Sequence, residues 1–505
     1  MSSPNGLDQS ASLRWGTYSL LIALAVGSMT GRLMAVNSVN RIELQKHLIR
    51  QDIARARQRL QNQQLPAEEY ERRLAAAELR IRENRQLERP FLSANDRSRW
   101  LAMRALVEHG TYEIDAVLDR NRWNTIDMVQ HRGRDGELHL YSSKPPLLYT
   151  LLAADYWLLS KLTGMTLGTH PYLMGRMMLV MFNIVPLAVM FFYLAKLAER
   201  FGTTDWGRIF VVASACFGTL LNAFAVALNN HLIAAVSATL ALYGFVRIWC
   251  DGESHLRYYI LTGFFAAFTA ANELPALAFL TLIAIALLTV NSQAWLKGFL
   301  PAAALVVIGF FATNYAAHNC LTPPYMHKGS DDPEENWYMY EYTIEGVTRQ
   351  SYWQNRQGVD IGEPSKAVYA MHCLVGHHGI FSLTPIWLLS FVGMTKWLRA
   401  DDARLRWIAS GIGLLTIVVL TFYIALRPQV DRNYGGVSCG LRWMIWFAPL
   451  WIVAMIPAAD RVARSRGWQT LAFVLLAVSV FSASFPTWNP WTHPWPYQFM
   501  EYLTD

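Results

Sequence analysis

The chain has 505 residues, of which 53% are hydrophobic, 13% aromatic and only 16% charged. Water-soluble chains carry about 25% charged residues, so this composition excludes an ordinary soluble domain and favours an all-α, polytopic transmembrane protein. The formal net charge of +7 comes from Arg and Lys in short loops between apolar runs. It is therefore an orientation signal for a membrane protein, and we expect no nucleic-acid partner.

The first predicted unit, residues 1–36, is a cytoplasmic N-terminus followed by one membrane span. The apolar run 15–33 is too long for the core of a signal peptide and has no convincing cleavage site. We interpret it as a retained signal anchor.

Residues 41–90 are rich in Arg, Glu, Gln, Ala and Leu, which are strong helix formers. Pro66 suits the first turn of a second helix. The pattern predicts a hairpin of two antiparallel helices inside a long external loop, residues 37–170. A structural insertion explains this hairpin more simply than a catalytic role does.

Ten further apolar runs predict membrane spans, which makes eleven with the anchor. Residues 147–162 are one more apolar run of marginal length. The spans are expected in units 171–317 (spans two to seven) and 380–505 (spans eight to eleven and an external tail), separated by a large external loop, 318–379. The predicted runs are 172–194, 209–228, 232–248, 259–271, 274–290, 299–316, 380–394, 408–426, 441–456 and 471–485.

The distribution of positive charge sets the predicted topology. Loops around 196–208, 247–257, 396–406 and 461–466 carry the Arg and Lys residues and are assigned to the cytoplasm. If residues 147–162 crossed the membrane, the first of these loops would be external. We therefore predict that 147–162 form an external interfacial helix and that the C-terminus is external.

With this topology, the chemically interesting polar residues all lie on the external side, and we hypothesise a shared site there, because ionisable groups near hydrocarbon are costly and usually serve a pocket. The alternative is that external loops are simply polar. Asp96 is a candidate general base, or else a residue that caps a helix. Lys144 precedes two prolines and is a candidate phosphate ligand, or else a lysine at the membrane boundary.

The segments 95–100 (NDRSRW) and 141–148 (YSSKPPLL) resemble the first-loop pattern of GT-C membrane glycosyltransferases. They are similar to the aminoarabinose transferase of lipid A and to the protein O-mannosyltransferases. In these families an Asp, followed by an Arg three positions later and then an aromatic residue, precedes a KPPL-type segment. Segments 379–385 and 435–442 also look like segments of bacterial members.

The resemblance implies that a sugar moves from a polyprenyl-phosphate donor to a lipid, glycan or protein acceptor. The reaction would take place, with inversion, on the periplasmic face of a bacterial inner membrane, in contact with membrane lipids. By this resemblance Asp96 is the base and Lys144 holds the donor phosphate, with Arg442 a second candidate for that charge. The further substrate-binding candidates are Arg99, Tyr141, Glu273 and His378.

Three questions stay open at this point: the need for a metal ion, the function, and the state of two cysteines. The family usually has two adjacent acidic residues where Asn95, Asp96 and Arg97 stand here, and a lone carboxylate is a poor divalent-cation site. We therefore assign no metal ligand and no certain cofactor, and leave a divalent cation as an alternative. A transporter or flippase for a lipid-linked solute, or a GT-C scaffold without chemistry, are the alternative functions. In the large loop, Cys320 and Cys373 are either a disulfide or two free thiols.

Overall fold

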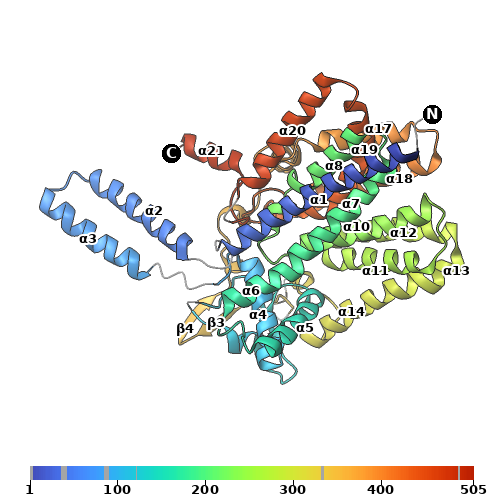
Figure 1. Ribbon diagram of the computed structural model, residues 1–505. Helices are drawn as coiled ribbons and strands as arrows, with labels where there is room; N and C mark the ends of the chain where they lie inside the picture. Colours follow the sequence, from blue (N-terminus) through green and yellow to red (C-terminus); the bar gives the residue numbers. More distant parts are fainter. Residues whose placement is uncertain are drawn as a thin grey trace.

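The computed structural model describes residues 4–35, 42–84, 90–120, 122–330, 332, 335–486 and 489–504. Helices dominate this part of the chain, and its only strands form two small two-stranded sheets. Figure 1 shows long helices running side by side, with the labelled strands near one end of the bundle and the N-terminus at the other. The predicted all-α class is confirmed.

Eight helical segments in the described residues are long and apolar enough to cross a membrane, as judged by length and composition. The chain is therefore a multi-pass membrane protein. Each of the eight overlaps a span predicted from the sequence. They are Gln9–Met34 within α1 (Pro4–Met34), Pro171–Phe201 (α6, Pro171–Leu179; η2, Val180–Ile184; α7, Val185–Phe201), Asp205–Phe224 (α8, Asp205–Phe217; α9, Leu221–Phe224), Asn230–Trp249 (α10), Ser292–His318 (α13, Ser292–Ala294; η4, Trp295–Phe299; α14, Leu300–His318), Ala403–Leu426 (α18, Ala403–Leu420; η8, Thr421–Leu426), Arg442–Val462 (η10, Arg442–Phe447; α19, Ala448–Val462) and Arg466–Ser484 (α20).

The other three predicted spans form shorter helices. α11 (Leu256–Asn272) packs against α10 and α14, and α12 (Leu277–Val290) follows it after the short η3 (Leu274–Ala276). The predicted span 380–394 is interrupted: α16 (Ile380–Leu383) ends before Pro385 and α17 (Trp387–Leu398) begins after it. Proline lacks an N–H and disfavours helical backbone in the residue before it, which explains the break. The count of eleven spans stays a prediction.

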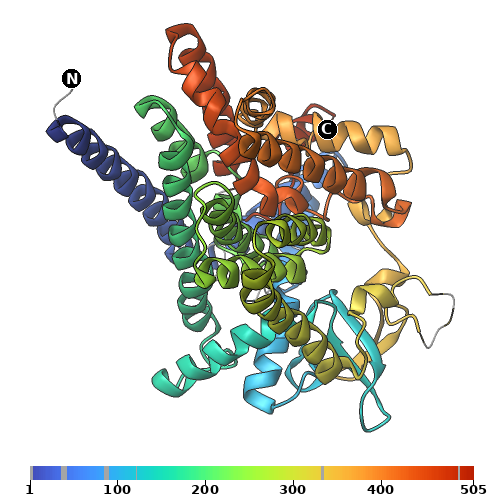
Figure 2. The ribbon, with the colours of Figure 1, turned by 90° about the vertical axis from the view of Figure 1, so that its right-hand side faces the viewer.

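The apolar run 147–162 forms α5 (Pro146–Thr163), which is not among the eight candidate spans of the described residues. The helix begins with Pro146, whose fixed φ suits a first helical position. It packs against α4 (Ala94–His109) and α14. In Figure 2, the teal α5 lies across the end of the long helices. Its predicted interfacial location stays a prediction.

The remainder of the first loop forms a short ribbon beside α4. After η1 (Asp115–Val117), β1 (Met128–Arg132) pairs antiparallel with β2 (Leu138–Ser142). The turn between them contains Gly136 at φ +85°, a conformation that glycine adopts without strain. The ribbon brings residue 127 beside residue 143.

The large loop contributes a second ribbon and several short helices. β3 (Glu341–Ile344) pairs antiparallel with β4 (Val347–Gln350). Backbone contact joins the two loops, because Gln130 N–H donates to the carbonyl of Trp337 at 3.0 Å. The short helices are η5 (Pro324–His327), η6 (Tyr352–Gln354), η7 (Gly358–Ile361) and α15 (Lys366–Leu374); further on come η9 (Gln429–Asp431) and α21 (Trp495–Thr504).

Two antiparallel helices form within residues 41–90, as the sequence predicts. α2 (Ile42–Gln61) and α3 (Ala67–Asn84) pack on each other, and Figure 1 shows them extending away from the long helices. Pro66 immediately precedes α3, where its carbonyl accepts a bond from Tyr70 N–H at 2.9 Å.

Loops that the charge pattern assigns to the cytoplasm contact one another at the N-terminal end of the bundle. Arg14 pairs with Glu199 at 2.8 Å, and Arg404 donates to the carbonyl of Cys250 at 2.8 Å. The labelled strands β3 and β4 lie at the other end of the bundle (Figure 1), and the β1–β2 ribbon contacts the large loop there. Which loops are external stays a prediction of the charge pattern.

Candidate functional site

A cavity of about 800 Å³ lies at the strand-bearing end of the bundle. It is lined by α4, residues 126–127 and 143–145 at the open end of the β1–β2 ribbon, the large loop and the helix connections near residues 230, 273 and 430. Its charged lining residues are Arg99, Asp127, Lys144, Glu273, Lys328, Asp360, Arg427, Asp431 and Arg442.

An acid–lysine pair stands beside the first ribbon. Lys144 Nζ lies 2.9 Å from Asp127 Oδ2, and both side chains are largely buried, at 16% and 13% exposure. The ribbon fixes this pair because Met128 pairs with Ser142, and Ser143 N–H donates to the carbonyl of Asp127 at 3.2 Å. Backbone hydrogen bonds thus hold the two groups close together.

Burial and neighbouring charge set the protonation of this pair. Burial lowers the pKa of Lys144 to about 8; Asp127 opposes this shift, and Arg99 adds to it. Burial alone would raise the pKa of Asp127, but Lys144, Arg442 and Arg99 outweigh it and hold that pKa below its usual value. Asp127 is therefore a carboxylate at neutral pH, and Lys144 is a cation that releases its proton readily.

Arg99 joins the first loop to the start of α10. Its Nη1 donates to Asn95 Oδ1 at 2.8 Å, and its Nη2 donates to Asn230 Oδ1 at 2.6 Å. Burial lowers the pKa of Arg99 to about 10, so the guanidinium is still charged at neutral pH. Both of its bonded partners are neutral amides.

Glu273 follows α11 and accepts hydrogen bonds from two other segments of the chain, the start of α10 and η8. Its Oε1 accepts from Asn230 Nδ2 at 2.8 Å and is paired with His231 Nδ1, while its Oε2 accepts from Tyr423 at 3.3 Å. The carboxylate is 4% exposed. These bonds join the start of α10, the residue that follows α11 and η8 into one wall of the cavity.

Arg442 begins η10, and its Nε donates to the carbonyl of Gly435 at 2.6 Å. Gly435 has φ +92°, and a Cβ there would come within 2.8 Å of Arg442 Nε, so the close approach requires glycine. The Arg442 guanidinium lies 4.9 Å from the centre of the Trp491 ring. A second guanidinium, that of Arg427, lies 4.2 Å from the centre of the Trp443 ring.

Three guanidiniums that line the cavity have no carboxylate partner within 4 Å among the described residues: Arg99, Arg427 and Arg442. Of the four cavity carboxylates, Asp127 pairs with Lys144 and Asp431 with Lys328, whereas Glu273 and Asp360 have no Lys or Arg partner within 4 Å among the described residues. Five cationic and four carboxylate side chains give the lining a small excess of positive charge, which favours an anionic ligand in a partly enclosed space.

Asp96, the base predicted from sequence, lies in the first turn of α4. Its Oδ1 accepts from Ser93 N–H at 2.9 Å, as half of a reciprocal capping box. The side chain is 2% exposed and is not among the residues that line the cavity. The geometry is that of the helix cap considered as its alternative role.

Tyr141 and His378 also lie outside the cavity lining. Tyr141 stacks on His131, with the ring centres 4.1 Å apart, where the ribbon meets the large loop. His378 stacks on Tyr434 at 4.5 Å within a cluster of histidines near the C-terminal segment. Of the predicted substrate-binding residues, the cavity brings together Lys144, Arg99, Glu273 and Arg442.

Sequence reasoning missed Asp127. The signal was present in the hairpin turn, because Asp135-Gly136 between two alternating segments is typical of a tight β-turn. Antiparallel pairing across that turn puts residue 127 opposite Ser143, and thus next to Lys144. Counting residue pairs outward from the turn would have placed Asp127 next to Lys144.

Cys320 and Cys373 are free thiols in the structure, and Cys320 Sγ lies 3.3 Å from the carbonyl of Thr322. Among the described residues, no three His, Cys, Asp or Glu side chains are grouped in a way that could hold a metal ion. We assign no metal ligands.

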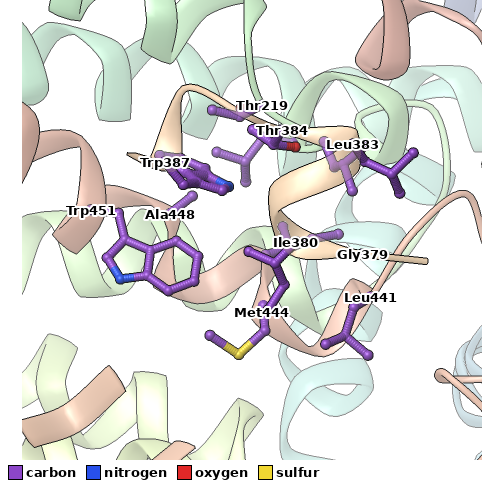
Figure 3. A pocket seen from close by; sticks show the side chains of 13 residues that line it. Thr219, Gly379, Ile380, Leu383, Thr384, Trp387, Leu441, Met444, Ala448 and Trp451 are labelled. Atoms are coloured by element: carbon purple, nitrogen blue, oxygen red, sulfur yellow. The ribbon is translucent and has the colours of Figure 1, made fainter. Parts of the chain in front are cut away.

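A second, much smaller cavity of about 30 Å³ lies between α16, η10 and α19. Figure 3 shows Ile380, Trp387, Met444 and Trp451 around it, with Thr384 among its few polar neighbours. Its volume suits one or two water molecules. Segment 379–385, one of the family-like segments, therefore contributes to packing here.

The fold and the cavity define a multi-pass membrane protein with a charged site at one end of its helices. No family model matches the chain, and no curated protein matches it. Solved structures that align with it include the following two. One is the oligosaccharyltransferase of Archaeoglobus fulgidus in its apo form, with 10% identity and a TM-score of 0.40 over 82% of this chain and 56% of that one. The other is the oligosaccharyltransferase AglB of the same organism in complex with an inhibitory peptide and a dolichol-phosphate, with 9% identity and a TM-score of 0.39 over 79% and 52%. The chain thus spans little more than half the length of these proteins.

Proposed function

We propose that this protein is a GT-C membrane glycosyltransferase that transfers a sugar from a polyprenyl-phosphate donor to an acceptor at the external face of a bacterial inner membrane. The observation that carries the proposal is the group of three guanidiniums without a carboxylate partner within 4 Å, in the same cavity as the Asp127–Lys144 pair at one end of apolar helices. The first-loop motifs support it independently.

The donor phosphate binds among Lys144, Arg99 and Arg442. Guanidinium and ammonium groups form strong charge-assisted hydrogen bonds with phosphate oxygens. These groups also stabilise the negative charge that grows on the leaving phosphate as its bond to the sugar breaks. The lipid tail lies along the apolar helices that border the cavity.

Asp127 serves as the base. It accepts the proton of the acceptor hydroxyl as the hydroxyl oxygen attacks the anomeric carbon, and the bond from that carbon to the phosphate oxygen breaks. The products are the glycosylated acceptor, with inverted configuration, and the lipid phosphate. Asp96, the base suggested by the motif, stays a competing prediction that the same assay tests.

The decisive experiment is an in vitro transfer assay with labelled polyprenyl-phosphate sugars, including aminoarabinose and mannose donors. We expect Asp127→Asn to lower transfer at least 100-fold, because a general base contributes about 10²–10⁴. Asp96→Asn keeps an oxygen for the Ser93 N–H and should transfer within about fivefold of wild type. If Asp127→Asn matches wild type while Asp96→Asn is inactive, the base is Asp96 instead.

The same assay separates a transferase from the alternative functions. Neither a flippase nor a scaffold without chemistry breaks the sugar–phosphate bond of the donor, so both give no transfer. Parallel reactions with a chelator such as EDTA test the divalent-cation alternative. Loss of transfer on chelation, restored by added cation, would establish a metal requirement.

A further inference from the structure

We call the part of the cavity around Asp127, Lys144, Arg99 and Arg442 the reaction centre. Beyond it, the cavity extends to the large loop, where the types of lining residue are different. We call this part the loop-side wall; it consists of Tyr338, Tyr352, Trp353, Asp360 and Asn433. The reaction centre is rich in guanidiniums, whereas the wall combines aromatic rings with a carboxylate.

Asp360 is the anionic group of the loop-side wall. Its Oδ2 accepts from Tyr352 at 2.9 Å, and its Oδ1 accepts from Asn433 Nδ2 at 2.6 Å. It forms no ion pair within 4 Å among the described residues. Since a carboxylate has about four acceptor positions, Asp360 retains capacity for hydroxyl donors from a ligand.

Trp353 supplies an aromatic surface beside this carboxylate. Its ring meets Tyr338 and Tyr352 edge-on, with ring centres 5.7 Å and 5.5 Å apart. Its indole Nε1 is buried and has no hydrogen-bond partner in the structure. A buried N–H without a partner is costly, so a ligand oxygen at this position would remove a penalty.

The charge of the wall differs from that of the reaction centre. Lys328 Nζ lies 2.6 Å from Asp431 Oδ1, so these two charges neutralise each other. Lys328 and Arg356 lie 4.8 Å and 5.7 Å from the centre of the Trp353 ring, so the charges around the loop-side wall nearly balance, while the three guanidiniums leave the reaction centre positive. A second phosphate is disfavoured at the wall, and a neutral ligand rich in hydroxyl groups is favoured.

We propose that the loop-side wall is the acceptor subsite and that the acceptor is a saccharide with free hydroxyl groups. A pyranose ring has an apolar face of C–H bonds that packs on an aromatic ring, and its hydroxyls donate to carboxylates. This inference rests on the proposed function, because it assigns the second substrate of the same site. A free glycan and a glycolipid headgroup present the same chemistry.

The test measures saccharide binding to the full chain in lipid nanodiscs. The nanodiscs are prepared without maltoside or glucoside detergents, whose sugar headgroups would occupy the site. The probes are methyl glycosides of glucose, galactose, mannose and N-acetylglucosamine, observed by saturation-transfer difference NMR, and a galactosyl diacylglycerol incorporated in the disc. A short peptide rich in serine and threonine is the competing probe.

We expect at least one methyl glycoside or the galactosyl diacylglycerol to bind. Comparing the glycolipid with the methyl glycosides decides whether the acceptor is a glycolipid headgroup or a free glycan. Trp353→Ala and Asp360→Asn should each weaken this binding at least tenfold, and Trp353→Phe should retain most of it because a ring remains. The matched controls are Trp468→Ala and Asp401→Asn, which change exposed residues in segments 466–484 and 399–402, and these should stay within twofold.

Saccharide binding that is unchanged in both wall variants overturns the proposal, as does peptide binding that those variants abolish. Binding of undecaprenyl phosphate is measured on the same samples, with Arg442→Gln as the reaction-centre variant and a melting curve as the folding check. If the lipid phosphate binds but no saccharide does, the acceptor inference is wrong and the proposed function is retained. If saccharides bind at the wall but no donor supports transfer, the proposed function is wrong and the saccharide site is retained.

Discussion

At the scale of single residues, the site depends on a lysine whose ammonium group has a lowered pKa. Lys144 is buried beside Asp127, and burial lowers its pKa to about 8. The Asp127 carboxylate supports the ammonium, while Arg99 and Arg442 oppose it. Small changes of pH near 8 therefore change the net charge of the cavity.

This predicts that binding of lipid phosphate weakens as pH rises from 7 to 9. The ammonium form dominates below about 8 and is lost above it, so the phosphate loses one cationic partner. The measurement is a titration of undecaprenyl phosphate into nanodisc-embedded protein at each pH. Lys144→Arg is the control, because a guanidinium keeps its charge over this range and the pH dependence should disappear. A wild-type affinity that is flat from pH 7 to 9 would contradict the assignment of Lys144.

A second residue-scale prediction separates capping from catalysis at Asp96. Asp96→Ala removes the acceptor of the Ser93 N–H and should lower the free energy of unfolding by about 1 kcal/mol, the usual value of an N-terminal cap. Asp96→Asn should cost less, because the amide oxygen can still accept. Thermal unfolding of the two variants measures the difference. Equal stability of Asp96→Ala and wild type would rule out the capping role.

The sequence identified four of the cavity's residues: Arg99 by its place in the first-loop motif, and three others because their types are unusual where they stand. Lys144 precedes two prolines, and Glu273 and Arg442 abut apolar helices, so each needed an explanation. Asp96 carried the strongest motif match, yet it caps a helix, since motif position alone does not determine where a side chain points. Asp127 required knowledge of strand register.

At the scale of elements, the C-terminal segment is attached to the bundle through histidines. His377 stacks on His372, with ring centres 3.8 Å apart, and its Nδ1 faces Nδ1 of His378. From the C-terminal segment, His493 stacks on Tyr497 at 4.0 Å and lies 6.0 Å from His378. Elements on both sides of this contact therefore present imidazoles to one another.

Burial lowers the pKa of His377 to about 4, and neighbouring histidines add to the effect. Burial likewise lowers the pKa of His378, His372 and His493; Glu363 near His372 and Glu501 near His493 oppose it. Neutral imidazoles are thus favoured in the folded state, whereas an unfolded histidine titrates near 6.5.

The predicted consequence is a loss of stability in mild acid. Above about pH 6.5 the stabilising contribution is complete, and as pH falls toward 4 the unfolded state binds more protons than the folded state, so stability falls. Melting temperatures measured from pH 7.5 to 4.5 should show this decrease, and His377→Gln should flatten it. His170→Gln, which changes an exposed histidine, is the control. An identical slope in His377→Gln and wild type would exclude the cluster as its source.

Element types were largely predictable, whereas breaks within elements were not. The apolar runs and the Glu- and Arg-rich hairpin follow composition and periodicity, which act locally. The interruption between α16 and α17 shows that one Pro can divide an apolar run of sufficient length. The β1–β2 ribbon escaped notice because five-residue strands carry little periodic signal.

At the scale of the whole molecule, the charge pattern and the packing agree on how the loops are grouped. The predicted cytoplasmic loops contact one another at one end, and the cavity lies at the other. Which end faces the cytoplasm is a prediction of the positive-inside rule.

Cysteine labelling tests this orientation directly. Four native cysteines are buried, so replacing Cys320 alone gives a suitable background. Thr348→Cys, exposed on β4, should react with a membrane-impermeant maleimide added to intact spheroplasts. Ser254→Cys, exposed in the loop before α11, should react only after the membrane is permeabilised. The opposite pattern would invert the topology and place the cavity in the cytoplasm.

The tip of the β1–β2 ribbon is also a suitable site for inserting a short peptide. Its ladder joins residues 128–132 to 138–142, and residues 134–138 at the tip are exposed. The separation of Asp127 from Lys144 is set by that ladder, so it is independent of how long the connecting turn is. An epitope or a nanobody-binding peptide inserted at the tip would mark the cavity end of the protein for imaging while leaving the geometry of the pair intact.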